Sequence, residues 1–216
     1  MTPSPLPSAP RTPLHLRASA LSRFLFAHPG MAPVWLLLRL YVGWQWLSSG
    51  LEKVGNPAWV GADAGKAVTG FLQGALKKTG GEMPDVTGWY ARFIENVALP
   101  GAGLFSYLVT FGELAVGAAL ILGLLTGIAA FFGMLMNFAY LFAGTLSSNP
   151  LLLLLGLLLV LAWRVSGWWG LDRLLLPRWW GWNRTDQEML VGQVQRDHTP
   201  TDQAPSDQAQ ADQARR

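Results

Sequence analysis

Long apolar runs, separated by short polar breaks, fill most of this chain. Four runs have the length of about 20 residues that a helix needs to cross the roughly 30 Å hydrocarbon core of a bilayer. They cover residues 32–53, 104–124, 127–147 and 150–170. The first run is too long for a cleavable signal peptide, contains Arg39 and ends without a small-residue cleavage site. The pattern therefore predicts four transmembrane helices that all stay in the protein.

The connections between the last three runs are very short, which forces successive helices to run antiparallel and to pack as neighbours. We expect an all-α integral membrane protein with four antiparallel transmembrane helices in one domain, residues 32–182. Residues 1–31 start with a proline- and serine-rich leader and continue as a basic segment, and residues 183–216 repeat Asp-Gln pairs. The leader and this tail are predicted to be disordered, and the basic segment to lie along the membrane surface.

The connection between the first two runs, residues 54–103, is long and patterned. Apolar residues recur at helical spacing in two stretches, which are split by Thr79-Gly80-Gly81. This pattern predicts an extramembrane loop of two short amphipathic helices that lie on the membrane or cap the bundle. The loop is either a surface-bound connector or a lid over a substrate site, and the sequence leaves both open.

Basic residues suggest how the chain is oriented. Their densest flank follows the last run and contains Arg164, Arg173, Arg178 and Arg184. Basic flanks favour the cytoplasm, and an even number of spans places both termini on one side. We therefore expect a multi-pass protein of the inner (plasma) membrane with both termini in the cytoplasm. Glu52 and Lys53, at the outer end of the first run, are expected to anchor that helix at the interface.

Two ionisable residues lie well inside predicted helices, where a charge is costly and normally faces a partner within the bundle. Arg39 lies about seven residues from the cytoplasmic end of the first run, and Glu113 about eleven residues from that of the second. The axial offset between them is about 6 Å at 1.5 Å per residue, which a long arginine side chain covers. We expect Arg39 and Glu113 to form an intramembrane ion pair.

Other polar residues fall at a similar depth. Asn137 and Tyr140 share one face of the third run, and Gln45 belongs to the first. Together with the ion pair they predict a polar cluster near the middle of the membrane. Such a cluster is either an architectural core that fixes which helix faces meet, or a functional site, since ionisable residues within a membrane commonly mark one.

The residue content narrows the chemistry. The chain has no cysteine, so disulfides, thiolate catalysis and protein-bound iron–sulfur clusters are excluded. Its three histidines, His15, His28 and His198, lie outside the runs, which excludes a histidine-ligated haem in the bundle. We find no flavin or metal motif. The net charge of +3 is spread along the membrane flanks and predicts no nucleic-acid partner.

Several motifs carry a family resemblance. The pattern Arg39-Leu-Tyr-x-Gly-x-x-x-Leu-x-x-Gly-x-x-Lys53, followed by Gly112-Glu113-x-x-x-Gly117-x-x-Leu-x-x-Gly123, resembles the DoxX family of bacterial membrane proteins, and within it the DoxD-type branch. The similarity continues through FFGMLMNFAYLFAGT in the third run, the SSNP turn and the ending GWWGLDRLLLP. The resemblance thus covers about residues 35–180, because the motifs follow one another in the order and with the spacing of the family.

The resemblance implies a four-helix integral membrane protein with a role in electron transfer. The DoxD branch is similar to the larger subunit of thiosulfate:quinone oxidoreductase, in which thiosulfate is oxidised to tetrathionate and electrons enter the quinone pool. It therefore implies a membrane subunit of a quinone-linked oxidoreductase, with quinone as cofactor and a second oxidoreductase subunit as partner besides the lipid bilayer. Without cysteine or histidine in the bundle, electrons would reach the quinone directly or through that second subunit.

If the chain is such an enzyme, Arg39 and Glu113 are the catalytic candidates. Arg39 would bind an anion or polarise a quinone carbonyl, while Glu113 orients it and handles protons. The residues expected to bind quinone are Gln45, Trp46, Asn137 and Tyr140, with Trp46 against the ring. Two other functions stay open: a small-anion transporter with Arg39 as the counter-charge, and a non-catalytic membrane scaffold for an oxidoreductase complex.

Overall fold

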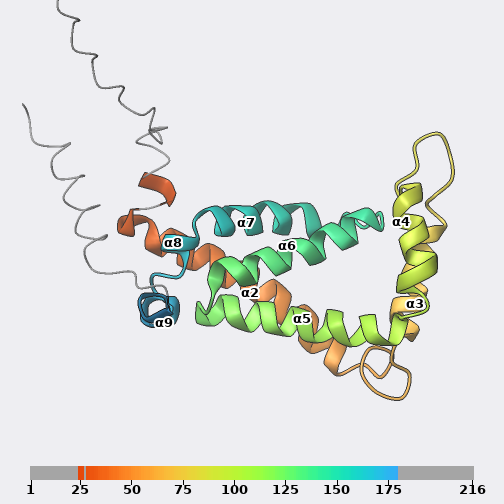
Figure 1. Cartoon of the computed structure of the whole chain (residues 1–216), viewed down its shortest axis with the longest axis horizontal. Coiled ribbons are helices and arrows are strands. Elements are labelled where there is room, and N and C mark those ends of the chain that lie inside the picture. Colours follow the sequence, from red (N-terminus) through yellow and green to blue (C-terminus); the bar gives the residue numbers. More distant parts are fainter. Residues whose placement is uncertain (1–23, 27, 180–216) are drawn as a thin grey trace, which may run out of the picture.

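The computed structural model describes residues 24–26 and 28–179, with side chains to residue 175. Within this part of the chain every regular element is a helix (Figure 1). The N-terminal leader and the C-terminal tail, for which disorder was predicted, lie outside the described residues, as does nearly all of the basic segment between residues 14 and 28.

Four helices form the body of the molecule and correspond to the four predicted runs (Figure 1). They are α2 (Ala32–Val54), α5 (Ala102–Leu122), α6 (Thr126–Phe142) and α7 (Asn149–Leu161). On length and composition, α5 is the one described helix that meets the criteria for crossing a membrane, and α6 and α7 are apolar but shorter. The four helices thus exist, while the structure by itself supports one membrane span.

The last two helices are shorter than the sequence pattern predicts. Helix α6 ends at Phe142, because the chain then turns through left-handed backbone at Gly144 (φ 69°) and Ser147 (φ 40°). The fourth run breaks at Ala162, so that α7 has 13 residues and the short helix α8 (Trp163–Ser166) follows it. A last helix, α9 (Asp172–Trp179), lies at the same end of the bundle (Figure 1).

Helices α2 and α5 pack antiparallel and very closely, because glycines line their interface. A Cβ added at Gly50 would lie 2.9 Å from the backbone nitrogen of Leu114, and one at Gly43 would lie 3.1 Å from the Gly117 carbonyl oxygen. Small residues of this kind allow two helix backbones to approach. The same contacts fix the register, in which Gly50 lies beside Leu114 and Arg39 lies beside Gly123.

The loop between α2 and α5 folds into a cap, residues 55–101, across one end of the bundle (Figure 1). It contains α3 (Lys66–Leu76), α4 (Gly88–Phe93) and a π-helical turn, η2 (Ile94–Ala98). The two amphipathic stretches were predicted from their spacing, and their apolar faces pack together in a hydrophobic cluster that includes Val68, Leu72, Tyr90 and Ile94. The cap therefore buries its own small core against the bundle.

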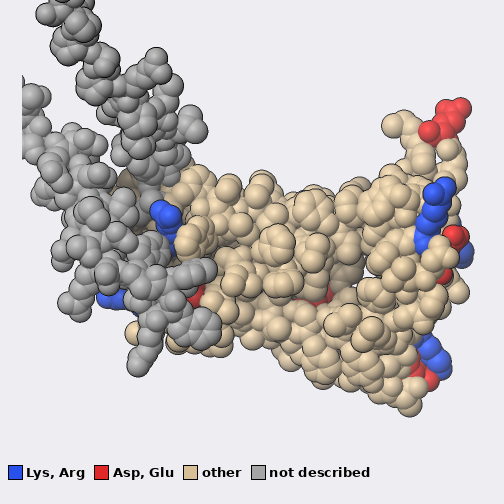
Figure 2. Space-filling model, viewed as in Figure 1, with Lys and Arg blue, Asp and Glu red and all other residues tan. Residues whose placement is uncertain are grey.

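Charged side chains gather at the two ends of the molecule, and the surface between them is almost entirely uncharged (Figure 2). Large apolar side chains are exposed along this middle zone. They include Leu37, Trp44, Leu104, Leu108, Phe131, Phe132 and Leu135. Exposing so many large apolar side chains to water is costly, and such a zone is typical of a surface that faces lipid or a partner protein.

Candidate functional site

Arg39 lies at the end of the bundle away from the cap, and it is 1% exposed. Its guanidinium donates from Nη1 to the Ser166 carbonyl at 3.2 Å and from Nη2 to the Trp169 carbonyl at 3.3 Å. Asp172 is near enough to interact with its charge. Arg39 thus holds the carbonyl groups that the end of α8 and the following turn present.

Asp172 ties the same region to the start of α6. Its carboxylate accepts hydrogen bonds from the backbone nitrogens of Leu125 (2.5 Å) and Thr126 (2.9 Å). These are N–H groups that a helix start leaves without internal partners. Gly123, with φ 65°, passes so close to Arg39 and Gly170 that no side chain fits there. Arg39 and Asp172 therefore form a structural lock that joins α2, α6 and the α8–α9 turn.

The predicted ion pair between Arg39 and Glu113 is wrong. The prediction treated the cytoplasmic ends of α2 and α5 as level, but α2 begins well beyond the end of α5. Arg39 is consequently level with Gly123, and Glu113 lies about ten residues, or 15 Å, further along α5. The guanidinium pairs with carbonyls of the α8–α9 region instead.

Glu113 has a different cation as its partner. Lys53 Nζ lies 2.7 Å from Glu113 Oε2, and the Tyr140 hydroxyl donates to Oε1 at 2.7 Å. The Glu113 side chain is 1% exposed and that of Lys53 16% exposed. Lys53 therefore does not simply anchor the end of α2 at the interface, as predicted, but forms a buried ion pair. Three helices, α2, α5 and α6, each supply one member of this polar group.

The cap covers the polar group from one side. Lys53 also donates to Ser49 Oγ at 2.7 Å, and its ammonium lies 5.1 Å from the centroid of the Trp59 ring. The ring of Phe71, on α3, meets that of Tyr140 edge to face, with centroids 6.0 Å apart. The aromatic residues of the cap thus shield the ion pair, and the ammonium gains a cation–π contact from Trp59.

Tyr90 fastens the cap to the end of α6. Its hydroxyl donates to the Ala139 carbonyl at 2.8 Å. Burial raises the pKa of Tyr90 because the anion would lose its hydration. The hydroxyl therefore stays a donor well into the alkaline range.

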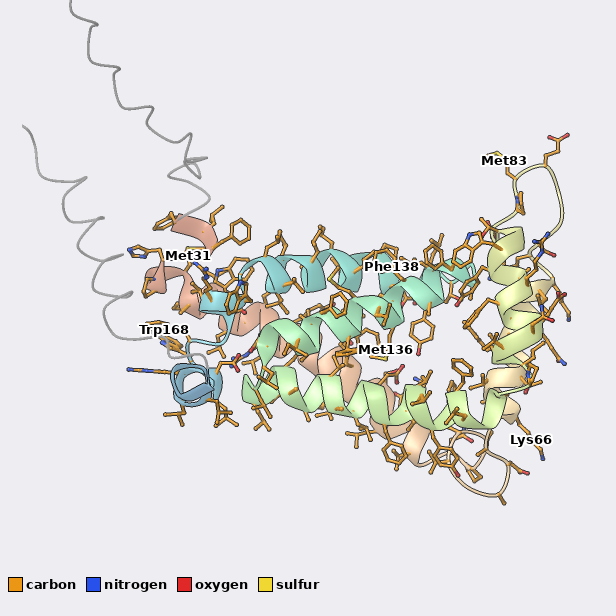
Figure 3. The ribbon with its side chains drawn as sticks, viewed as in Figure 1. Met31, Lys66, Met83, Met136, Phe138 and Trp168 are labelled. Atoms are coloured by element: carbon orange, nitrogen blue, oxygen red, sulfur yellow. The ribbon has the colours of Figure 1, made fainter. Side chains whose placement is uncertain are left out.

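Asn137 is a buried polar residue of α6, one turn before Tyr140. It is 1% exposed, and neither its amide nitrogen nor its amide oxygen has a hydrogen-bond partner among the described residues. Helices α5 and α6 approach each other at this level, since a Cβ at Gly112 would lie 3.3 Å from Met136 Sδ. Glu113 is the residue after Gly112, and Asn137 is the residue after Met136. Met136 lies in the space between α5 and α6 (Figure 3). A buried amide without partners is costly, so this position favours a bound polar molecule.

The two other predicted site residues of α2 lie apart. Trp46 is 4% exposed and its indole nitrogen would lie 3.0 Å from a Cβ at Gly133, one turn before Asn137 on α6. Gln45 is half-buried and donates to the Tyr41 hydroxyl at 3.1 Å on the outward side of the helix. The structure therefore joins Glu113 to Tyr140, places Asn137 one turn before Tyr140 on α6 and Trp46 beside Gly133 one turn before Asn137, and leaves Gln45 and Arg39 elsewhere.

Lys53 is the site residue that the sequence reasoning missed. The spacing of Gly43, Gly50 and Gly117 contains the signal, because close packing at these glycines sets α2 against α5 in the register that places Lys53 beside Glu113. In the described part of the chain, no three His, Asp or Glu side chains gather as they would around a metal ion.

A family model described as "TQO small subunit DoxD" matches residues 35–195, about three quarters of the chain. Its description names a small subunit, which corrects the larger subunit that the sequence resemblance implied. No curated protein and no solved structure gives a significant match.

Proposed function

The chain belongs to the DoxD family, and from this premise we propose that it is a membrane subunit of a thiosulfate:quinone oxidoreductase (TQO). A partner subunit oxidises thiosulfate to tetrathionate and delivers the electrons, and this chain holds the quinone that accepts them. The observation that carries the proposal is the buried group of Glu113, Lys53 and Tyr140 beside the unpartnered amide of Asn137.

We propose that α2, α5, α6 and the α7–α8 segment all cross the inner membrane. The exposed apolar band and the charges at both ends support this arrangement (Figure 2), because lipid is the solvent that such a band matches. The cap then lies on the outer face, and both termini lie in the cytoplasm. The basic residues after the last span support this orientation.

The residues around Asn137 fit a quinone ring. A quinone carbonyl would accept from the Asn137 amide nitrogen, a buried donor that has no partner among the described residues, while Tyr140 would reach the quinone by turning its hydroxyl away from Glu113. Trp46 provides an apolar wall on the same side of the bundle. When bound, the quinone supplies a two-electron acceptor that also takes up two protons. In this proposal Glu113 keeps its catalytic role, whereas the contacts of Arg39 favour a structural one.

The test uses protein in proteoliposomes with a soluble quinone analogue, thiosulfate and the partner subunit. Quinone reduction is followed by ultraviolet absorbance. Replacing Asn137 by leucine keeps the size of the side chain but removes the amide nitrogen and the amide oxygen. We expect the quinone KM to rise by about tenfold, which corresponds to the loss of one or two hydrogen bonds. Lys66→Met, which breaks the exposed pair with Asp63, is the control.

The other outcomes separate the alternatives. No reduction by wild-type protein together with its partner would overturn the oxidoreductase assignment, and thiosulfate flux in the same vesicles would then indicate a small-anion transporter. Reduction that requires this chain but is indifferent to Asn137 and Tyr140 would identify a scaffold. Arg39→Gln is informative only if the variant is still folded, because the hydrogen bonds of Arg39 to the Ser166 and Trp169 carbonyls join α2 to the α8–α9 region.

A further inference from the structure

We propose that Lys53, Glu113 and Tyr140 form a proton path that supplies the quinone site from the cap side of the membrane. The inference rests on the proposed function, since quinone reduction consumes protons. It adds a proton-transfer role for Lys53, which acts through Glu113, and a side of the membrane from which the protons come.

The three side chains form an unbroken chain of short hydrogen bonds. Lys53 Nζ to Glu113 Oε2 and Tyr140 hydroxyl to Glu113 Oε1 are both 2.7 Å. Each link joins a group that carries a proton to one that accepts it. Both neighbours donate to the carboxylate, one to each oxygen, so a proton that Glu113 gains from Lys53 reaches Tyr140 once the hydroxyl turns to accept it.

Exposure gives the chain a direction. The Lys53 side chain is 16% exposed and that of Glu113 1% exposed, so the lysine is the end nearer to water. Lys53 lies at the last turn of α2, where the chain enters the cap. The opposite end of the bundle is closed by the buried contacts of Arg39 with the Ser166 and Trp169 carbonyls. Protons therefore reach Glu113 most directly from the cap side.

The titratable neighbours of Glu113 are few. Lys53 faces it from α2 and Tyr140 from α6, and the cap contributes Phe71, which is apolar, against Tyr140. Tyr90 of α4 is the next titratable group, and its hydroxyl is already engaged with the Ala139 carbonyl. Among the described residues, the path thus has one cation, one carboxylate and one phenol.

Each transfer balances as follows. The Lys53 ammonium gives a proton to Glu113 Oε2, and the carboxylic acid and the Tyr140 hydroxyl then turn, so that the acid proton passes to the Tyr140 oxygen while the hydroxyl proton goes to a quinone oxygen. Lys53, left as a neutral amine, takes a proton from water on the cap side. Two such transfers accompany the two electrons that the thiosulfate-oxidising partner subunit provides.

Lys53→Arg separates proton transfer from structure. Arginine preserves the positive charge beside Glu113, but its pKa is too high for it to release a proton. A purely structural ion pair would tolerate this change, whereas a proton path would be blocked. The matched control is Lys66→Arg, at an exposed lysine that also pairs with a carboxylate.

The first measurement needs no quinone. Infrared spectra of protein oriented in sealed proteoliposomes follow the band of a protonated carboxyl group that is absent from Glu113→Gln. We expect a pH drop on the cap side, and not on the other side, to raise this band in the wild type, and Lys53→Arg to slow the rise by about 100-fold. An equal response to both sides, or an unchanged rate in Lys53→Arg with an unchanged melting temperature, would overturn the path.

The second measurement links the path to the reaction. Quinone reduction in Lys53→Arg should fall by about 100-fold with the quinone KM unchanged, and alkylamine added to Lys53→Ala should restore part of the rate. Full activity in Lys53→Arg would overturn the proton path and leave the quinone site standing. If wild-type protein reduces no quinone, the proposed function fails, and the infrared response still decides whether Glu113 is protonated through Lys53.

Discussion

At the scale of single residues, Glu113 is held by one interaction on each carboxylate oxygen. Taking a charge out of water is costly, so a buried pair contributes less to stability than its short distance suggests. Removing one partner is worse than removing both, because the remaining charge stays buried without compensation. The ion pair is therefore best tested by comparing single and double substitutions.

We expect Glu113→Gln to lower the free energy of unfolding by about 3 kcal/mol, near the lower end for a buried pair because Lys53 reaches some water. The double variant Glu113→Gln with Lys53→Met should recover part of this loss. Thermal unfolding in detergent measures both. Equal losses in the single and double variants would mean that Lys53 and Glu113 are not coupled.

The lock at Arg39 makes a separate prediction. Arg39→Gln shortens the side chain and removes its two hydrogen bonds to carbonyls, so we expect hydrogen exchange to rise over residues 163–175 and at the start of α6. The cap should keep its protection. Arg92→Gln, on the exposed side of α4, serves as the control. Faster exchange around Glu113 with an unchanged α8–α9 region would contradict this assignment.

At the scale of elements, the cap depends on a glycine where it joins the bundle. Gly65 has φ 99°, and a Cβ there would lie 2.8 Å from the Gly103 nitrogen at the start of α5. An L-residue is disfavoured in this left-handed backbone, and the neighbouring atoms belong to the main chain and cannot turn aside. The contact fixes α3 against the first turn of α5.

We therefore expect Gly65→Ala to destabilise the protein by about 2 kcal/mol, from backbone strain and the clash together. Gly70→Ala is the matched control, because Gly70 is helical and a Cβ there meets nothing within 4 Å. The control should stabilise α3 by about 0.5–1 kcal/mol. Melting temperature and protease sensitivity of residues 77–87 measure the two effects. A similar response from both variants would show that the cap does not depend on this contact.

The elements themselves could be predicted well from the sequence, and their relative heights could not. Apolar runs and helical spacing predicted the four helices and the two in the cap. The error arose from treating helix ends as level, which paired Arg39 with Glu113 and hid Lys53. The position of a charged residue along its own helix does not decide which residue it pairs with, because any two opposite charges near the middle of neighbouring helices are consistent with an ion pair. Close packing at Gly43, Gly50 and Gly117 decides the register, and its effect emerges only when the two helices are docked.

At the scale of the whole molecule, the charged ends and the apolar middle give the protein two distinct poles (Figure 2). The cap forms one pole, and the α8–α9 region with the Arg39 lock forms the other (Figure 1). If the bundle crosses a membrane, these poles face different compartments. The chain has no cysteine of its own, so single introduced cysteines report on each pole without background.

Met83, in the cap, is 92% exposed, and Leu174, on α9, is 70% exposed. We expect a membrane-impermeant maleimide to label Met83→Cys in intact cells, and to label Leu174→Cys only after the membrane is opened. Quantitative labelling on gels provides the measurement. The reverse pattern would invert the proposed orientation, and labelling of both in intact cells would contradict a bundle that separates the two poles.

The lock at Arg39 also has a consequence for the order in which the protein is made. The carbonyls that accept hydrogen bonds from the Arg39 guanidinium belong to Ser166 and Trp169. These residues follow Arg39 by 127 and 130 residues. At about 5–20 residues per second, a ribosome needs roughly 6–26 s to reach them. In the proposed transmembrane arrangement, α2 during that interval carries a charge whose partners have not been synthesised, so it does not settle at its final depth in the bilayer. In that arrangement, the insertion of α2 is completed only when the α8–α9 region has left the ribosome.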